Sequence, residues 1–388
     1  MIIIFYIALV YLLITSGILF LNRIDFTPLP PVPHHYFDRQ APKVSICIPA
    51  RNEANSIERC VRSAVDQQYP NVEVVVLDDN STDQTPEILA KLVDIFPDTL
   101  TVISGQPKPK GWLGKSWACH QLAEQTTSEI ITFIDADTWI EPEATTKIVR
   151  AMGRDIVDFI TLWPKQQLGT FWEKTVIPLV YWGLLTLLPT RYVYRHPKWL
   201  PVFLKDKIGA KFAAACGQFM AFKRNVYQKV GGHKSVKSKV VEDVELAKEI
   251  KRNGYAMKMY HGADTIGCRM YRSADELWQG FRKNFLAGFG NNLLLFIGMA
   301  LLQFVTFMLP VIALPFLFFF GTSKLFIVCL IVVALMIIQR FIVDRWFGWN
   351  PLFGLLHPIA VGWFQALGIK VLADYLKNKP TQWKGRDL

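Results

Sequence analysis

Three clusters of polar side chains follow directly on short apolar runs that are typical of buried strands. The clusters are Arg51-Asn52-Glu53, Asp78-Asp79 and Asp135-Ala136-Asp137. In open α/β sheets, ligands bind at the carboxyl ends of the strands, so these side chains are candidates for a binding site. The carboxylates of Asp135 and Asp137 could hold Mg²⁺ or Mn²⁺, and such an ion would neutralise charge on a bound phosphate. Aspartate is also common in turns that end strands, so the pair gains its weight from its neighbours.

Two further positions suit chemistry on a phosphate or on a hydroxyl group. Lys115 lies on a glycine-flanked turn before a helical pattern, a place that suits phosphate contact. An ordinary helix start with an exposed lysine has the same pattern. Glu242 and Asp243 open another helical pattern, and a carboxylate beside an acceptor oxygen could remove its proton. Acidic residues are also favoured at helix N-termini for electrostatic reasons alone.

Strand-like and helical segments alternate along the first part of the chain and would position these clusters. The strand-like runs are 44–48, 72–77, 100–103 and 130–134, and the helical patterns cover 57–65, 85–96 and 115–125. This alternation predicts an α/β domain with a parallel sheet and helices on both faces. The sequence contains neither G-x-G-x-x-G nor G-x-x-x-x-G-K-[ST], which disfavours a dinucleotide site and a P-loop kinase.

The order and spacing of three motifs resemble glycosyltransferase family 2. The motifs are Ile48-Pro49-Ala50-Arg51-Asn52-Glu53, Leu77-Asp78-Asp79-Asn80-Ser81-Thr82-Asp83 and Asp135-Ala136-Asp137. The resemblance covers residues 43–290 and implies the nucleotide-binding α/β fold called GT-A. The residues that it implies for the donor pocket are Pro49, Ala50, Arg51, Glu53 and Asp79, with Asp79 facing the base, usually uracil.

The same resemblance implies roles for the remaining charged residues. Asp137 would ligate the divalent metal, and Asp135 would lie beside it near the ribose or diphosphate. Lys115 would contact the donor. Glu242-Asp243 is similar to the family's Glu-Asp motif, in which the aspartate is the catalytic base, so Asp243 is the predicted base.

A fourth motif bears on the kind of product. Gln279-Gly280-Phe281-Arg282-Lys283 is similar to the Q-x-x-R-W motif of processive members, but Lys283 replaces the tryptophan that packs against a growing polymer. Polymer synthesis is therefore not expected. Gln279 would still bind the donor, and Arg282 would grip its diphosphate in a bidentate way. Residues 231–233, 268–272 and 382–386 are similar to segments of carotenoid- and hopanoid-associated enzymes.

Apolar segments at both ends predict a membrane protein. Residues 1–21 carry no charge and are long enough to cross a bilayer of about 30 Å, and they lack the basic start of a cleaved signal peptide. Runs 293–320, 323–339 and 351–373 each approach spanning length. The predicted organisation is an anchor (1–21), a linker (22–42), a GT-A catalytic domain (43–290), a transmembrane region (291–375) and a basic tail (376–388). Within the catalytic domain, 171–189 is apolar and proline-interrupted, which favours an interfacial helix over a buried core helix.

The net charge of +11 fits an anionic membrane surface, because the basic residues lie near apolar segments and no nucleic-acid motif is present. Lys and Arg beside spans mark the cytoplasmic side. We therefore expect a multi-pass cell-membrane protein with a cytoplasmic catalytic domain. The six cysteines form no zinc spacing, which predicts buried reduced thiols.

Together these features predict a metal-dependent, inverting hexosyltransferase that uses a nucleotide-sugar, UDP-glucose first. The predicted acceptor is a lipid such as a carotenoid or hopanoid-like terpenoid, and no nucleic-acid partner is expected. One alternative is a processive polysaccharide synthase. An alternative of another class is a catalytically inactive nucleotide-sugar-binding membrane protein, but all the carboxylates that activity needs are present.

Overall fold

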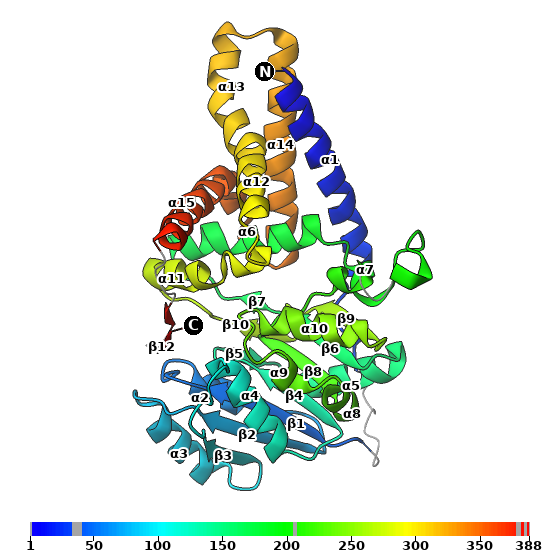
Figure 1. The fold of residues 1–388 in the computed structure, drawn as a ribbon, viewed down its shortest axis with the longest axis vertical. Coiled ribbons are helices and arrows are strands. Elements are labelled where there is room, and N and C mark those ends of the chain that lie inside the picture. Colours follow the sequence, from blue (N-terminus) through cyan, green and yellow to red (C-terminus); the bar gives the residue numbers. More distant parts are fainter. Residues whose placement is uncertain (1, 33–40, 205–207, 378–381, 384–385, 388) are drawn as a thin grey trace. The chain divides into compact units, whose positions relative to one another are not determined.

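The computed structural model describes residues 2–32, 41–204, 208–377, 382–383 and 386–387, and these divide into two compact units. We call them the sheet unit (Phe26–Gln167 and Thr190–Met270) and the helical unit (Met1–Asp25, Leu168–Pro189 and Tyr271–Leu388). Figure 1 shows both units coloured along the chain. Most of the predicted basic tail and part of the predicted linker lie outside the described residues.

A seven-stranded sheet with the order β3-β2-β1-β4-β8-β6-β9 forms the centre of the sheet unit. Its strands are β1 (Val44–Ala50), β2 (Val72–Asp78), β3 (Leu100–Ser104), β4 (Ile130–Ile134), β6 (Phe159–Trp163), β8 (Phe219–Lys223) and β9 (Met257–His261). The parallel pairing predicted for the first four strands is confirmed. Beyond these four strands the sheet is mixed, because β8 pairs antiparallel with both β4 and β6. The chain reaches β8 by a long excursion through the helical unit, so no short helical crossover imposes a parallel direction.

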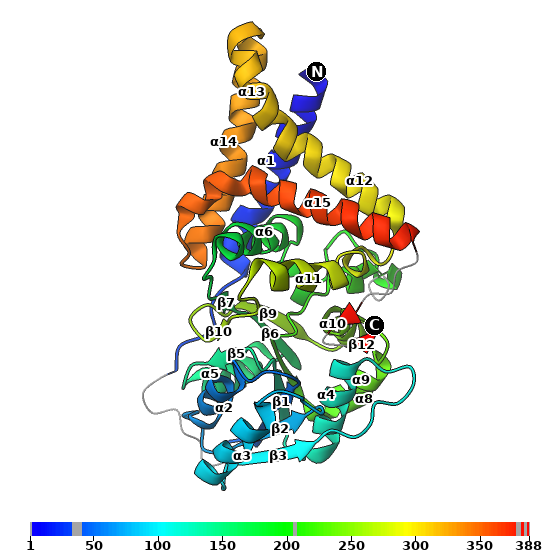
Figure 2. The same ribbon diagram turned by 90° about the vertical axis from the view of Figure 1, so that its left-hand side faces the viewer.

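Most helices of the sheet unit contact the sheet, and the longer ones bury an apolar stripe. The helices are α2 (Ile57–Val65), α3 (Thr85–Ile95), α4 (Gly114–Gln125), α5 (Ala144–Asp155), α7 (Arg191–Tyr194), α8 (Arg224–Lys229), α9 (Gly232–Ser235) and α10 (Glu242–Arg252), with short 3₁₀ turns η1 (Val202–Leu204) and η3 (Ala210–Phe212). In α2 the buried residues Ile57, Cys60, Val61 and Ala64 recur at helical spacing. Figure 2 shows α2 and α3 on one face of the sheet and α4 and α9 on the other. A small second sheet has the order β5 (Thr138–Ile140), β10 (Ile266–Cys268) and β7 (Lys165–Gln166). Its first strand, β5, follows β4 in the chain.

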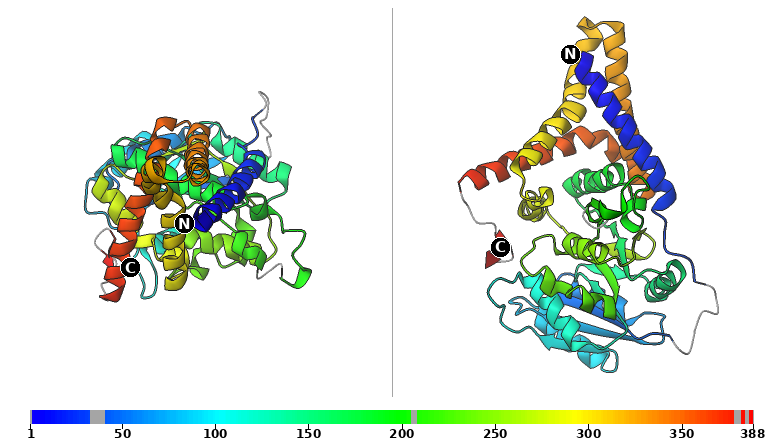
Figure 3. Two further views of the ribbon diagram at one scale, coloured as in Figure 1. Left: turned by 90° about the horizontal axis from the view of Figure 1, so that it is seen from above. Right: turned by 45° about the vertical axis from the view of Figure 1, so that its right-hand side comes forward.

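The helical unit contains the apolar segments predicted from the sequence. Its elements are α1 (Ile2–Asp25), α6 (Phe171–Leu187), α11 (Ala274–Asn284), η4 (Ala287–Phe289), α12 (Leu293–Gln303), η5 (Phe304–Met308), α13 (Leu309–Phe320), α14 (Ser323–Trp346), η6 (Pro351–Leu356), α15 (His357–Leu376), β11 (Gln382–Trp383) and β12 (Arg386–Asp387). Among the described residues, four stretches are long and apolar enough to cross a membrane: Ile3–Asp25, Leu293–Phe320, Ser323–Trp346 and Pro351–Leu376. Helix α14 packs against both α1 and α13, and Figure 3 shows α1 beside α14.

Helix α6 is the segment predicted to lie at the membrane interface. It begins with a capping box between Thr170 and Glu173, and it packs within the helical unit against α1, α14 and α15. Trp182 donates from its indole nitrogen to Gln339 at 3.0 Å. The observed units thus differ from the expected 43–290 domain, because 168–189 and 271–290 group with the apolar helices of the helical unit.

Candidate active site

The turn that follows β1 is fastened to the turn that follows β2. Arg51 donates from Nη1 to the carbonyl oxygen of Asp79 at 2.5 Å, and the Asn52 side-chain oxygen accepts from the Thr82 amide at 2.8 Å. Asn52 and Asn80 have φ values of 53° and 54°, a left-handed conformation that asparagine adopts more readily than most residues. The two asparagines therefore allow both turns to fold back on themselves.

The remaining predicted donor residues lie at the same edge of the sheet. Pro49 and Ala50 end β1, and the Asp79 amide donates to the Ala50 carbonyl at 2.8 Å. Asp79 is buried, with 4% of its surface exposed. The Glu53 amide donates to the Thr85 hydroxyl at 2.8 Å, which ties this turn to the start of α3.

Lys115 joins two carboxylates that are far apart in the sequence. Its Nζ lies 2.7 Å from Asp135 Oδ1 and 3.2 Å from Glu242 Oε1. Burial opposes the charged form, but the carboxylates of Asp135 and Glu242 hold the pKa of Lys115 well above its ordinary value. Lys115 is therefore a fixed positive charge between the turn after β4 and the start of α10.

Asp137 is the most perturbed carboxyl group at this edge of the sheet. The thiol of Cys268 donates to its Oδ1 at 3.5 Å. Burial raises the pKa of Asp137 to about 7, and the neighbouring carboxylates of Asp135 and Glu53 add to the effect. The three acids are therefore close enough to repel one another, which is an environment that attracts a cation.

Asp243 lies at the first turn of α10 beside Gly217. Its Oδ2 accepts from the Gly217 amide at 2.8 Å, and its Oδ1 accepts from the Val244 amide at 2.8 Å. Burial, followed by the charge of Glu242, raises the pKa of Asp243 to about 6. A general base works best with a pKa near the operating pH, so this carboxyl group suits proton removal close to neutrality.

The side chains around Asp137 fit a divalent cation shared with a ligand. Within the described part of the chain, no group of three His, Cys, Asp or Glu side chains could hold a metal alone. Mg²⁺ and similar ions are commonly held by one or two carboxylates together with substrate phosphates and water. Asp137 and Asp135 are two neighbouring acids whose charges repel each other, so these two carboxylates match that mode.

Several residues of the site were missed by sequence reasoning. Gln166 donates to Gln218 at 2.9 Å, and Gln218 donates to the thiol of Cys268 at 2.9 Å, which forms a relay of contacts ending on Asp137. A β-carbon at Gly217 would lie 3.1 Å from Lys115 Nζ and 3.2 Å from Asp243 Oδ2, so only glycine leaves this space open. The one local sign in the sequence was polar Gln218, directly before the apolar strand β8. The prediction of buried reduced thiols is confirmed, although Cys216 is only partly buried.

Two predicted site residues belong to the helical unit. Gln279 and Arg282 lie on α11, and Arg282 Nη1 donates to Gln279 Oε1 at 3.3 Å. Arg282 also pairs with Asp374 of α15, with Nη2 2.7 Å from Oδ2. The structure thus brings Lys115, Asp135, Asp137, Glu242 and Asp243 together in the sheet unit and holds Arg282 by a carboxylate of the helical unit.

Comparison with protein families gives two matches. Residues 45–231 match the model of Glycosyl transferase family 2, and residues 201–367 match that of Glycosyl transferase family 21. The first match contains the strand-end clusters and Lys115. The second contains Glu242, Asp243 and Arg282 together with most of the helical unit.

Similar proteins of assigned activity include 4,4'-diaponeurosporenoate glycosyltransferases. That of Staphylococcus haemolyticus is 26% identical over 262 residues, which are 63% of this chain and 61% of the relative. That of Staphylococcus aureus (strain USA300) is 27% identical over 254 residues, 64% of this chain and 62% of the relative. The chain thus spans about three fifths of the length of these relatives.

A solved structure shares the fold over nearly the whole chain. It is the mannosyltransferase PcManGT from Pyrobaculum calidifontis in complex with GDP-Man and Mn²⁺, with a TM-score of 0.57 and 18% identity. The match covers 97% of this chain and 99% of that one. The likeness shows that the mixed sheet with its apolar helices is an architecture found among glycosyltransferases.

Proposed function

We propose that this chain transfers a hexose from a nucleotide-sugar to a membrane lipid, because residues 45–231 match the model of Glycosyl transferase family 2. The observation that carries the proposal is the meeting of Lys115, Asp135, Asp137 and Asp243 at the carboxyl ends of the parallel strands. The order of these residues along the chain matches the order of the motifs in the family.

The donor occupies the turns after β1 and β2. Pro49, Ala50, Arg51 and Glu53 line the nucleotide pocket, and Asp79 faces the base. The backbone around Arg51 and Asp79 is pre-organised, because side chains already fasten the two turns together. UDP-glucose is the first donor to test.

Asp137 and Asp135 would hold a divalent cation together with the donor diphosphate. Such a cation supplies stabilisation of the charge that develops on the leaving diphosphate. Lys115 adds a positive charge next to Asp135, which favours the same anionic ligand. Arg282 is the guanidinium that we expect to assist at the phosphates.

The transfer itself needs one proton to move when the acceptor is a hydroxyl. The acceptor oxygen bonds to the anomeric carbon, the bond from that carbon to the diphosphate breaks, and Asp243 takes the proton from the acceptor. Attack opposite the leaving group inverts the configuration at the anomeric carbon. A carboxyl acceptor is already ionised near neutral pH, so the transfer then needs no base.

The acceptor is a hydrophobic lipid, with a carotenoid or hopanoid-like terpenoid first. Two observations support a lipid: four helices suited to a membrane, and relatives named for transfer to diaponeurosporenoate. The chain is a multi-pass protein of the cell membrane with its catalytic domain on the cytoplasmic side, where nucleotide-sugars are made.

Release of nucleoside diphosphate by the purified protein tests this proposal. UDP-glucose, UDP-galactose, UDP-N-acetylglucosamine and GDP-mannose are supplied in turn with a terpenoid-rich lipid extract, with Mn²⁺ or with EDTA. We expect release with one donor and its loss with EDTA and in Asp137→Ala. Absence of turnover with every donor would contradict a transferase, and unchanged turnover in Asp137→Ala would contradict the metal site.

A further inference from the structure

The helical unit encloses a pocket that the chemistry described above does not use. Its volume is about 420 Å³, within the range of about 300–1,000 Å³ that is typical of small-molecule sites. The lining comes from α6, α12, η5 and α15 and from the segment after α11. Six of the 21 lining residues are phenylalanines, and Trp182 adds a seventh aromatic ring.

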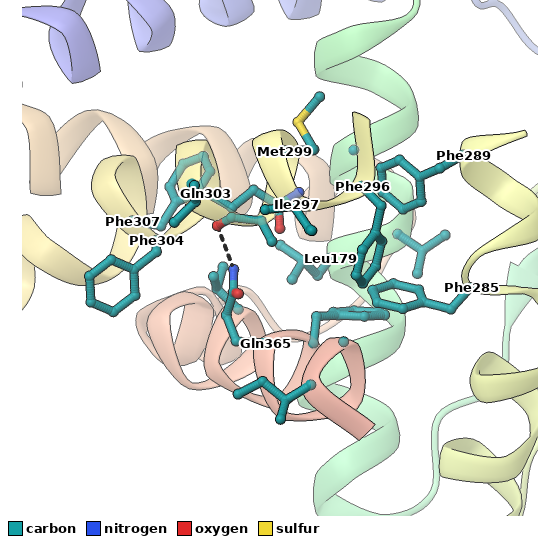
Figure 4. Close-up of a pocket in the computed structure, with 18 of the residues that line it drawn as sticks. Leu179, Phe285, Phe289, Phe296, Ile297, Met299, Gln303, Phe304, Phe307 and Gln365 are labelled. Atoms are coloured by element: carbon teal, nitrogen blue, oxygen red, sulfur yellow. Dashed lines mark hydrogen bonds between the residues drawn. The ribbon is translucent and has the colours of Figure 1, made fainter. Parts of the chain in front are cut away.

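The aromatic rings form two walls of this pocket. Figure 4 shows Phe285, Phe289 and Phe296 on one side and Phe304 and Phe307 on the other. On the first wall, the Phe285 and Phe296 ring centroids are 5.6 Å apart. The second wall depends on a local widening of the helix at η5, close to Pro310, which has no amide hydrogen to donate.

The polar character of the lining restricts what can enter. None of the described residues that line the pocket carries a charge, and the polar side chains are Gln303, Gln365 and the indole of Trp182. Gln365 already donates to the Ala300 carbonyl at 3.0 Å, and the Trp182 indole donates to Gln339 at 3.0 Å. A charged or sugar-bearing head group would find few free partners here, so the pocket suits a hydrocarbon chain whose head remains outside.

The pocket lies close along the chain to Arg282, which we expect to contact the donor diphosphate. Arg282 on α11 and Phe285 at the end of that helix are three residues apart, a rise of about 4.5 Å. Phe281, on the same helix, contacts Phe364 of the pocket with ring centroids 5.3 Å apart. A chain held in the pocket would thus leave its end near the helix that presents Arg282.

We propose that this pocket binds the conjugated isoprenoid chain of the acceptor, and that its aromatic walls select a rigid polyene over a saturated chain. Flat conjugated chains stack on aromatic rings, and they lose less conformational freedom on binding than saturated chains of similar length. Identifying this chain as the acceptor's rests on the proposed function, whereas binding itself does not require turnover.

A pair of glycine variants in one unit tests the pocket. Gly183 of α6 lines it, and a β-carbon there would meet nothing within 4 Å, so Gly183→Leu fills the space without a backbone clash. Gly298 of α12 also has nothing within 4 Å but does not line the pocket, so Gly298→Leu is the matched control. Both changes replace glycine by a better helix former, which protects the fold.

Binding of tritiated retinol is measured by scintillation proximity on protein in nanodiscs, with empty nanodiscs as background. We expect Gly183→Leu to weaken retinol binding by about tenfold or more and Gly298→Leu to leave it within about twofold. Unlabelled phytanol and octadecanol, which are saturated, should compete at least about tenfold more weakly than unlabelled retinol.

Three results would overturn the proposal: no binding above empty nanodiscs, equal binding by wild type and Gly183→Leu, or equal competition by the saturated alcohols. The last result would mean that bilayer lipid chains fill the pocket without selection. Nucleoside diphosphate release is measured in parallel. Wild-type protein that releases diphosphate but does not bind retinol refutes the pocket alone. Wild-type protein that binds retinol but releases diphosphate with no donor refutes the proposed function alone.

Discussion

Removal of the positive charge at Lys115 should shift the pH dependence of transfer to a hydroxyl-bearing terpenoid. Asp243 must be ionised to accept a proton, so the rate falls as the pH drops through its pKa of about 6. Lys115 lowers this pKa by electrostatic attraction to the carboxylate. Lys115→Met removes that attraction, so the pKa of Asp243 rises and activity is lost at a higher pH.

The expected size of this shift follows from the space at Gly217. A β-carbon there would lie 3.1 Å from Lys115 Nζ and 3.2 Å from Asp243 Oδ2, so the two charged atoms lie at most about 6.3 Å apart. At an effective dielectric constant of about 20 they attract each other by at least about 2.6 kcal/mol. The Lys115 side chain is 36% exposed, and solvent screening reduces this energy to about half. The midpoint of the acidic limb should therefore rise by about one pH unit, to about pH 7.

The assay is the pH profile of kcat/KM for sugar transfer, with the divalent cation saturating so that Asp137 stays ionised. Lys115→Met also loses a donor contact, but that loss lowers the rate at all pH values and leaves the midpoint unaffected. Lys115→Arg keeps the charge and should retain a midpoint near that of wild type. A midpoint that stays unchanged or falls in Lys115→Met would refute the electrostatic coupling of Lys115 to the base.

Three further changes test other parts of the account. Gly217→Val should reduce kcat by about 100-fold without a loss of folding by circular dichroism, because its side chain enters the space between Lys115 and Asp243; full activity would contradict this geometry. Asp344→Ala should destabilise the protein by about 3–5 kcal/mol in denaturant unfolding, because it removes the carboxylate that lies 2.8 Å from the buried Arg340 guanidinium. The control Glu249→Ala breaks the exposed pair with Arg252 and should cost less than about 1 kcal/mol. Asn52→Ala should be less stable than Asn52→Gly by about 1 kcal/mol in the same assay, since only alanine strains the left-handed φ of 53°; equal stability would show that this φ is not enforced.

The first half of the sheet could be predicted from the sequence because its information is local. Each strand is a short apolar run that ends in polar residues, and the buried spacing of α2 is visible in Ile57, Cys60 and Ala64. The antiparallel strand β8 could not be predicted in this way. Its direction depends on where the chain returns after leaving the sheet unit at residue 167, which no local pattern records.

The charged residues of the site were predictable, but the contacts that tune them were not. Aspartates that directly follow apolar strands, and a lysine on a glycine-flanked turn, can be recognised from residue type and local sequence alone. Gly217 and Cys268 have no such mark, because their roles arise from close approach to Asp243 and Asp137 across long sequence separations. Assignment of Gln279 and Arg282 to the helical unit likewise follows from packing of α11 on α6 and α15, not from their motif.

The most direct test of lipid glycosylation follows the sugar itself. The protein in nanodiscs is given the radiolabelled nucleotide-sugar that supports diphosphate release, together with a terpenoid alcohol, and the products are partitioned between water and organic solvent. The account predicts that label moves into the organic phase on the terpenoid, and that Asp137→Ala and Asp243→Asn abolish this transfer. Label that remains in water as free sugar, or that accumulates as a polymer, would contradict transfer to a lipid.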